Sequence, residues 1–187
     1  MCREVCVLSD DQPFENKEAI EMDDAAKKTA LRMIPYGIYV MTAEEGDEIA
    51  AATVNWVTQT SFEPPLIAVG VKADSGAYAV ARAAGIFALN MLGKGQQGAA
   101  FGFFKPAEKD GNTISGEPYR SGVSGAPLLD SAIATVECEL VEVVERGDHH
   151  IFVGEVIEAS VKSEPEGRPD KVILEMKDLG DNVFYGG

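Results

Sequence analysis

Apolar and polar residues alternate along two long stretches in the second half of the chain, residues 133–145 and 150–162. In the first stretch, Val136, Cys138 and Leu140 fall on one side and glutamates fall on the other. A period of two residues predicts a half-buried β-strand. After Leu140 the parity reverses, which predicts a β-bulge or a strand that passes from one layer to another. The two stretches therefore predict a long hairpin around a short Arg-Gly-Asp-His turn.

Shorter apolar runs, punctuated by turn residues, predict the remaining elements. An acidic cap and an alanine-rich run predict a first helix, and Ser75 and Gly85 bracket a second one. Residues 105–127 are rich in Gly, Pro, Ser and Asn and predict a long loop. The fold is therefore expected to be mainly β with a few short helices, a barrel rather than a doubly wound sheet. The expected strands are 38–42, 49–54, 66–71 and 86–92, and the expected helices are 25–33, 76–84 and 96–104.

Length and composition indicate one globular domain, since the 187 residues are 45% hydrophobic and 25% charged. Residues 1–24 hold eight acids and two bases and are interpreted as an acidic extension, which leaves residues 25–187 as the domain. The net charge of −15 repels phosphate backbones and anionic lipids, so it disfavours nucleic-acid and membrane-surface functions.

The cysteines and the apolar runs bear on the compartment. Cys2 and Cys6 lie in the polar N-terminal stretch and are interpreted as surface thiols, whereas Cys138 occupies a core position of the alternating strand. No apolar run reaches the length of about 20 residues that spans a bilayer, and no secretory signal is visible. The expected location is the cytoplasm.

Candidate chemistry starts at residues 53–65, which combine amide and hydroxyl side chains with the only tryptophan, Trp56, and a single charge at Glu63. Such a segment suits the edge of a planar, uncharged ligand better than a metal ion or an exposed anion. A Thr- and Ser-rich strand on a half-exposed sheet face would have the same composition. Composition alone leaves both interpretations open.

A second candidate is the sequence Gly93-Lys-Gly-Gln-Gln-Gly98, which matches the G-x-G-x-x-G dinucleotide fingerprint. It follows a predicted strand and opens a predicted helix, as a pyrophosphate site requires. However, Lys105-Pro106 stops that helix early, and no second apolar strand ending in an acid follows about 20 residues later. A Rossmann-type site is therefore the minor alternative.

The sequence contains few residues that would form a metal site or a hydrolytic active site. The two histidines, His149 and His150, are adjacent, so on a strand their side chains point to opposite faces. No nucleophile elbow or phosphate-loop motif is present. If the protein is an enzyme, an organic cofactor is expected to carry the chemistry.

Five linked motifs stand in order along the chain: residues 37–42, 53–65, 90–92, 125–129 and 147–154. Together they resemble the flavin reductase-like family, whose members have an FMN-binding split β-barrel. The resemblance covers roughly residues 28–160, and the sequence Trp-Val-Thr-Gln-Thr-Ser-Phe is also similar to the flavin reductase module of some flavodiiron proteins. The chain departs from the family in its acidic extension and in Asp74-Ser75-Gly76, where members often carry more basic phosphate contacts.

The resemblance implies a set of site residues. His149 is the implied catalytic residue, near flavin and nicotinamide; without the resemblance it would be a solvated turn residue. The isoalloxazine would contact residues 55–58, and the ribityl chain would lie along Thr60 and Ser61. The phosphate would bind at the start of the second helix, where Ser75 is also a plausible helix cap. The implied cofactor-binding residues are Asn55, Trp56, Val57, Thr58, Thr60, Ser61, Lys72, Ser75 and Asn90.

The function implied by the resemblance is hydride transfer from NAD(P)H to FMN, rather than FAD, with electrons passed on to free flavin, ferric chelate, oxygen or a partner protein. The family also implies a homodimer. One alternative is an FMN electron carrier without pyridine-nucleotide turnover, whose acidic surface docks a basic partner. The others are a Rossmann-type dinucleotide-binding protein and a flavin-free barrel that acts as an interaction module.

Overall fold

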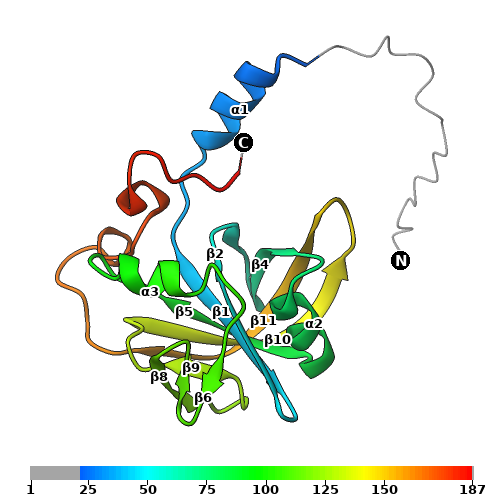
Figure 1. Cartoon of the computed structure of the whole chain (residues 1–187), viewed down its shortest axis with the longest axis vertical. Coiled ribbons are helices and arrows are strands. Elements are labelled where there is room, and N and C mark those ends of the chain that lie inside the picture. The colour runs from blue at the N-terminus through cyan, green and yellow to red at the C-terminus, as the bar shows by residue number, and fades with distance from the viewer. Residues whose placement is uncertain (1–21, 187) are drawn as a thin grey trace, which may run out of the picture. The chain divides into compact units, whose positions relative to one another are not determined.

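A computed structural model describes residues 22–186 (Figure 1). Contacts within the chain divide these residues into two units, one with residues 22–33 and Gly186 and the other with residues 34–185. The first unit contains helix α1 (Asp24–Arg32). Asp23 caps it, because its carboxylate accepts hydrogen bonds from the N–H groups of Ala25 and Ala26 at 2.8 and 3.2 Å. The predicted first helix is confirmed. Cys2, Cys6 and most of the predicted extension 1–24 lie outside the described residues, and the domain boundary stays a prediction.

The second unit is built on a seven-stranded sheet in which every pair of neighbours is antiparallel (Figure 1). Its two outer strands, β2 and β3, do not pair with each other, so the barrel is split rather than closed. The expected barrel of mainly β structure is confirmed. In spatial order the strands are β2 (Glu48–Val54), β1 (Tyr39–Glu45), β5 (Ile86–Met91), β10 (Ala134–Val144), β11 (His149–Val161), β4 (Pro65–Lys72) and β3 (Val57–Phe62).

The long hairpin of β10 and β11 contains the predicted bulge, since the pairing shifts between Leu140 and Glu142. A second shift, between Glu137 and Cys138, was not predicted. It accompanies an inward-facing carboxylate, because Glu137 is only 2% exposed and accepts hydrogen bonds from the N–H groups of Val123 and Ser124 at 3.1 and 2.7 Å. The hairpin therefore also anchors the loop before β9 (Pro127–Leu129).

The main core lies between the sheet and helix α2 (Gly76–Ala84), whose apolar side packs against β1 and β2. Phe87 and Phe152 are fully buried there, with ring centroids 6.2 Å apart. A Cβ atom at Gly154 would collide with the Phe87 ring, so glycine is required at this contact. Cys138 is fully buried beside them as predicted, and burial raises the pKa of its thiol to about 12.

Residues 105–127 were predicted to be a loop, and this prediction was wrong. They contain the short strands β6 (Lys109–Asp110), β7 (Thr113–Ile114) and β8 (Glu117–Ser121), which form a second, four-stranded sheet with β9. Ile114 is fully buried in the second apolar cluster. Two-residue strands have too few positions to show a period, so the turn residues around them dominate the sequence pattern.

The C-terminal stretch runs back along the sheet through the 3₁₀-helices η1 (Pro169–Lys171) and η2 (Met176–Leu179). Leu174, fully buried, donates its N–H to the Leu92 carbonyl at 2.7 Å. This path brings Tyr185 beside the residues that connect β2 to β3. Among the described residues, no helix has the length and apolarity that crossing a bilayer requires.

Candidate flavin site

Trp56 lies in the two-residue link between the edge strands β2 and β3. Its carbonyl accepts a hydrogen bond from the N–H of Gly70 at 2.8 Å, and its indole covers that glycine so closely that a Cβ atom there would lie 3.0 Å from the ring. Gly70 therefore creates the space that the indole occupies on β4. The indole Nε1 is buried and has no hydrogen-bond partner in the described structure.

Three aromatic side chains from distant parts of the chain meet here: Trp56, His149 and Tyr185, called the aromatic cluster below. The ring centroids of Trp56 and His149 are 4.6 Å apart with an edge-on geometry, and Tyr185 lies 5.5 Å from Trp56. Asn55, itself buried, donates from Nδ2 to the Tyr185 carbonyl at 3.2 Å. The predicted residues Asn55, Trp56 and His149 are thus brought together.

His149 links two groups of different acidity. Its Nδ1 lies 2.9 Å from Asp148 Oδ1 and its Nε2 lies 2.7 Å from the hydroxyl oxygen of Tyr185. The hydrogen bond with His149 is the first cause of the lowered pKa of the Asp148 carboxyl, whereas burial is the first cause of the raised pKa of the Tyr185 hydroxyl. In a neutral imidazole beside an ionised Asp148, Nδ1–H donates to the carboxylate, which leaves Nε2 to accept from the tyrosine O–H. The His149 side chain is only 13% exposed, so it is not a solvated turn residue.

The predicted ribityl contacts lie along the outer strand β3. Thr58 and Thr60 are exposed, and Val57 and Ser61 are partly exposed. The pairing of β3 with β4 shifts between Gln59 and Ser61, which places Thr60 at an irregularity of the edge. An open strand edge of this kind leaves hydroxyl and backbone groups accessible to a ligand.

The predicted phosphate contacts stand at the start of α2. The Ser75 hydroxyl accepts from the Tyr78 N–H at 3.1 Å and donates to the Lys72 carbonyl at 2.7 Å, so it is a helix cap. The Lys72 ammonium lies 3.0 Å from Asp74 Oδ1, and this hydrogen bond is the first cause of the raised pKa of Lys72. Asp74 thus neutralises part of the charge that a phosphate would meet. The phosphate contact itself stays a prediction.

Asn90 does not join this group of residues. It is fully buried near the C-terminal end of β5, where Nδ2 donates to the Val40 carbonyl at 3.1 Å and to Thr42 Oγ1 at 3.0 Å. Its Oδ1 accepts from the Leu129 N–H at 2.7 Å. Because protein atoms occupy both ends of the amide, the structure gives Asn90 a structural role in place of the expected cofactor contact.

The Gly93–Gly98 loop has none of the context of a dinucleotide site. Its strand β5 pairs antiparallel on both sides, and helix α3 (Gln97–Gly102) has six residues. The Gln96 side chain fills the loop, since Oε1 accepts from the Gly93 N–H at 2.5 Å and Nε2 donates to the Ser131 carbonyl at 2.7 Å. The Rossmann alternative was therefore wrong.

Sequence reasoning missed Tyr185, Asp148 and Gly70 as parts of the site. Tyr185 lies 130 positions from Asn55, and no local period links them. Asp148 precedes a histidine in a turn, where a carboxylate is unremarkable. An isolated glycine in the predicted strand 66–71 was the only available signal, because such a glycine indicates a close approach.

The described residues fit a flavin ring better than its phosphate. A planar heterocycle suits an aromatic cluster with a buried, unpaired indole N–H next to an open polar strand edge. The phosphate would meet a single lysine, Lys72, whose charge is already paired with Asp74, so this part of the site fits its ligand less well. Within residues 22–186, no group of three or more His, Cys, Asp or Glu side chains is placed so that it could hold a metal ion.

Comparison with known proteins places this geometry in a family. Residues 31–177 match the flavin reductase like domain. A flavin reductase of Pseudomonas putida is 33% identical over 138 residues, which cover 73% of this chain and 79% of the relative. Diflavin flavoprotein A 1 of Synechocystis is 30% identical over 80% of this chain, but the match spans only 26% of that longer protein.

Solved structures agree with the sequence relatives. The NADH:FAD oxidoreductase SgcE6 of Streptomyces globisporus, in complex with NAD and FAD fragments, is 35% identical with a TM-score of 0.60 over 68% of this chain and 76% of that one. An FMN-binding protein from Thermus thermophilus is 25% identical with a TM-score of 0.62 over 69% and 72%. The chain therefore belongs to the flavin reductase-like family and is a flavin reductase-type enzyme, an oxidoreductase that acts on flavin.

Proposed function

We propose that this chain accepts hydride from NAD(P)H on a bound FMN and passes the electrons to free flavin, a ferric chelate, oxygen or a partner protein. The observation that carries the proposal is the aromatic cluster beside the open edge of β3, with an unpaired indole N–H. The solved relative that binds NAD and FAD fragments supports the nicotinamide donor, and the FMN-binding relative supports FMN.

FMN would lie along the path that connects the link between β2 and β3 with the start of α2. Residues 55–58 would hold the isoalloxazine edge, Thr60 and Ser61 the ribityl chain, and Lys72 and Ser75 the phosphate. When bound, the flavin supplies the hydride acceptor. The protein's task is to place two flat rings against each other and to exclude water between them.

His149 would act as the catalytic residue by holding a defined proton arrangement next to the rings. Because Asp148 accepts from Nδ1, the Nε2 lone pair faces the Tyr185 hydroxyl. That hydroxyl stays protonated at neutral pH, since its pKa is raised above the usual 10.0. The Tyr185 ring packs against Trp56 with ring centroids 5.5 Å apart. Together they form a rigid, polar wall without a strong acid or base.

The enzyme is further proposed to be a cytoplasmic homodimer, as the family resemblance implies. In the single chain, three apolar side chains of β10 and β11 have exposed fractions of 42–49%: Val141, Ile151 and Ile157. A second copy would cover such a surface. Sedimentation or light scattering at micromolar concentration tests this, and a strictly monomeric chain would contradict it.

Anaerobic spectroscopy tests the proposed function. Protein loaded with FMN should lose its visible flavin absorption when NADH or NADPH is added. Unreacted flavin with both nucleotides, but reduction by a protein donor, would instead support the second candidate, an electron carrier that docks a partner. The net charge of −15 and the facing glutamates Glu139 and Glu155 of the long hairpin favour that candidate's basic partner.

A further inference from the structure

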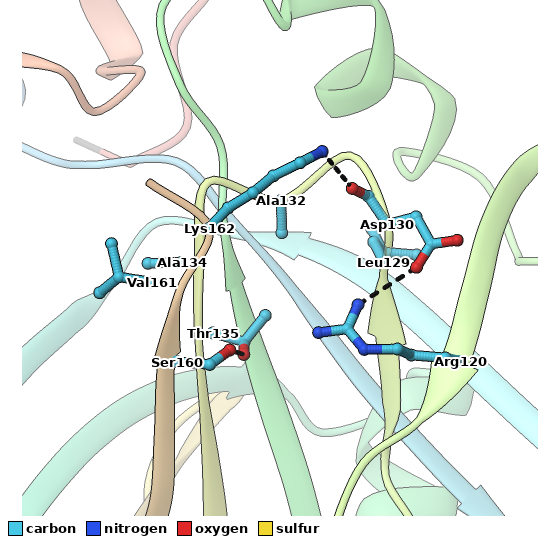
Figure 2. A pocket seen from close by; sticks show the side chains of 9 residues that line it. All are labelled: Arg120, Leu129, Asp130, Ala132, Ala134, Thr135, Ser160, Val161 and Lys162. Atoms are coloured by element: carbon cyan, nitrogen blue, oxygen red, sulfur yellow. Dashed lines mark hydrogen bonds and ion pairs between the residues drawn. The ribbon is translucent and has the colours of Figure 1, made fainter. Parts of the chain in front are cut away.

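A hollow of about 380 Å³ lies at the end of the β10–β11 hairpin away from the turn that carries His149 (Figure 2). Eleven residues separate His149 from Ser160 along β11, about 36 Å at the rise of an extended strand. The hollow is therefore separate from the candidate flavin site of the same chain. Its lining residues are Arg120, Leu129, Asp130, Ala132, Ala134, Thr135, Ser160, Val161 and Lys162.

Two cations of this strongly acidic chain border the hollow, and both are tied to one residue. Arg120 Nη1 lies 3.1 Å from Asp130 Oδ1, and Lys162 Nζ donates to the Asp130 carbonyl at 2.9 Å. The backbone N–H of Lys162 donates to the Ile133 carbonyl at 2.9 Å, which fixes the root of that side chain. A guanidinium has five N–H donors, so one ion pair leaves others available. Figure 2 shows the second terminal nitrogen of Arg120 directed towards Thr135 and Ser160.

Thr135 and Ser160 supply a polar part of the wall on the side of Arg120 (Figure 2). They are register partners on β10 and β11, and their hydroxyl oxygens are 2.7 Å apart. Thr135 is only 4% exposed. In a pair of hydroxyls that shares one hydrogen bond, the accepting hydroxyl keeps its own proton. That proton is available to a ligand oxygen.

The charges and the walls define the ligand. Arg120 and Lys162 contribute two positive charges and Asp130 one negative charge, so the hollow carries one uncompensated positive charge. The remaining lining is apolar, and the volume suits a small organic molecule. We infer that this hollow binds a small organic carboxylate, with the carboxylate between Arg120 and the hydroxyl pair and the apolar body against Ala134 and Val161.

A carboxylate fits better than a phosphate for two reasons. The planar guanidinium matches the two oxygens of a carboxylate in a fork-like contact. A phosphate monoester carries between 1.5 and 2 negative charges at about pH 7, which exceeds the single positive charge available beside Asp130. This inference does not depend on the proposed FMN site.

Benzoate is the probe that tests the inference, titrated into the full chain with and without saturating FMN and followed by two-dimensional amide NMR. We expect saturable binding in the millimolar range or tighter, with the largest shifts at Thr135, Ser160 and Lys162. Arg120→Gln should weaken benzoate binding about tenfold or more, because it removes a charge-assisted contact. Thr135→Val, which keeps the shape and removes the hydroxyl, should weaken it severalfold.

Arg168→Gln is the matched control, because Arg168 forms a comparable exposed pair with Asp170 at 2.6 Å and the substitution removes the same charge. It should leave benzoate affinity unchanged. An absence of saturable shifts, shifts centred on Trp56, an equal loss in the control, or tighter binding of inorganic phosphate than of benzoate would each overturn the inference. FMN affinity, measured through Trp56 emission, should be the same in all variants, so failure of the proposed function would be visible separately.

Discussion

His149 Nε2 lies 2.7 Å from the hydroxyl oxygen of Tyr185, although 36 residues separate the two along the chain. This contact closes the aromatic cluster over Trp56 and links the turn of the long hairpin to the C-terminal stretch. It depends on Asp148, which occupies the other ring nitrogen of His149 at 2.9 Å. The same three groups therefore govern the tautomer of the histidine and the position of the tyrosine ring.

Tyr185→Phe should keep the ring and remove the hydroxyl that Nε2 accepts from. Loss of one hydrogen bond of this kind costs about 0.5–1.5 kcal/mol, so flavin reduction should slow about two- to tenfold. Stopped-flow reduction with NADH measures this directly, with the binding constant of FMN as a second readout. Phe184→Leu is the neighbouring control. If Tyr185→Phe reduces flavin at the same rate as the unchanged protein, the Tyr185 hydroxyl does not contribute to flavin reduction.

Acid titration tests the Asp148–His149 pair. A carboxyl whose folded pKa lies below its unfolded value of 3.8 stabilises the folded state above that value, and this contribution disappears as pH falls through the folded pKa. The unchanged protein should therefore lose part of its free energy of unfolding as pH falls below about 4. Asp148→Asn has no carboxyl at this position, so its free energy of unfolding should lack this loss. Denaturant unfolding at successive pH values, followed by Trp56 emission, measures the difference. Parallel curves for the two proteins would contradict the assignment.

The phosphate assignment predicts different responses from two flavins. Removing the Lys72 charge or the Ser75 hydroxyl should weaken FMN more than riboflavin, which lacks the phosphate. The expected difference is about 1–3 kcal/mol for charge-assisted contacts. Asp74→Asn should strengthen FMN relative to riboflavin, because it releases Lys72 from its ion pair. Equal changes for both flavins would show that the phosphate binds elsewhere.

Glu137 provides a prediction about stability away from the flavin. Its buried carboxylate accepts from the Val123 and Ser124 N–H groups and from the Ser124 hydroxyl. Glu137→Ala would leave these donors unpaired and should lower the free energy of unfolding by about 1–3 kcal/mol. Gly122→Ala should also destabilise the fold, because its Cβ would collide with the carboxylate. Urea unfolding measures both, and the exposed Glu142→Ala serves as the control.

The sequence predicted those elements whose signals are local. Ser75 and Gly85 bracket α2 as expected, because a side-chain cap and a left-handed glycine with φ of 66° act within one turn. The parity reversal after Leu140 located the bulge, since alternation reports directly which face is buried. Opposite orientation of the adjacent histidines was also confirmed, with His150 bonded to Tyr78 and His149 to Tyr185.

The rest of the site depends on long-range contacts that leave no local trace. Tyr185 reaches Trp56 only because η1, η2 and the Leu174 contact route the C-terminal stretch along the sheet. Asn90 was predicted to contact the cofactor because it belongs to a family motif. The sequence alone does not distinguish a polar residue that faces a ligand from one that forms hydrogen bonds inside the core. In the structure, the backbone N–H of Leu129, 39 positions away, donates a hydrogen bond to Asn90 Oδ1.

Trp56 is the only tryptophan and serves as a probe of flavin placement. FMN bound where we propose would lie at aromatic contact distance, about 4.5–7 Å between centroids, and should quench most of the indole emission at one flavin per chain. Trp56→Phe should retain binding, whereas Trp56→Ala should weaken it by about 0.5–1.5 kcal/mol beyond the lost contact area. Unchanged emission at saturating FMN would place the flavin away from the aromatic cluster.

The most direct test of the central claim is anaerobic stopped-flow reduction of the FMN-loaded protein by NADH and NADPH, each with hydrogen or deuterium at the transferred position of nicotinamide C4. We expect at least one nucleotide to bleach the flavin in a single saturable phase, with deuterium slowing that phase severalfold because the C4–H bond breaks in it. A flavin that binds but stays oxidised with both nucleotides would contradict hydride transfer at this site.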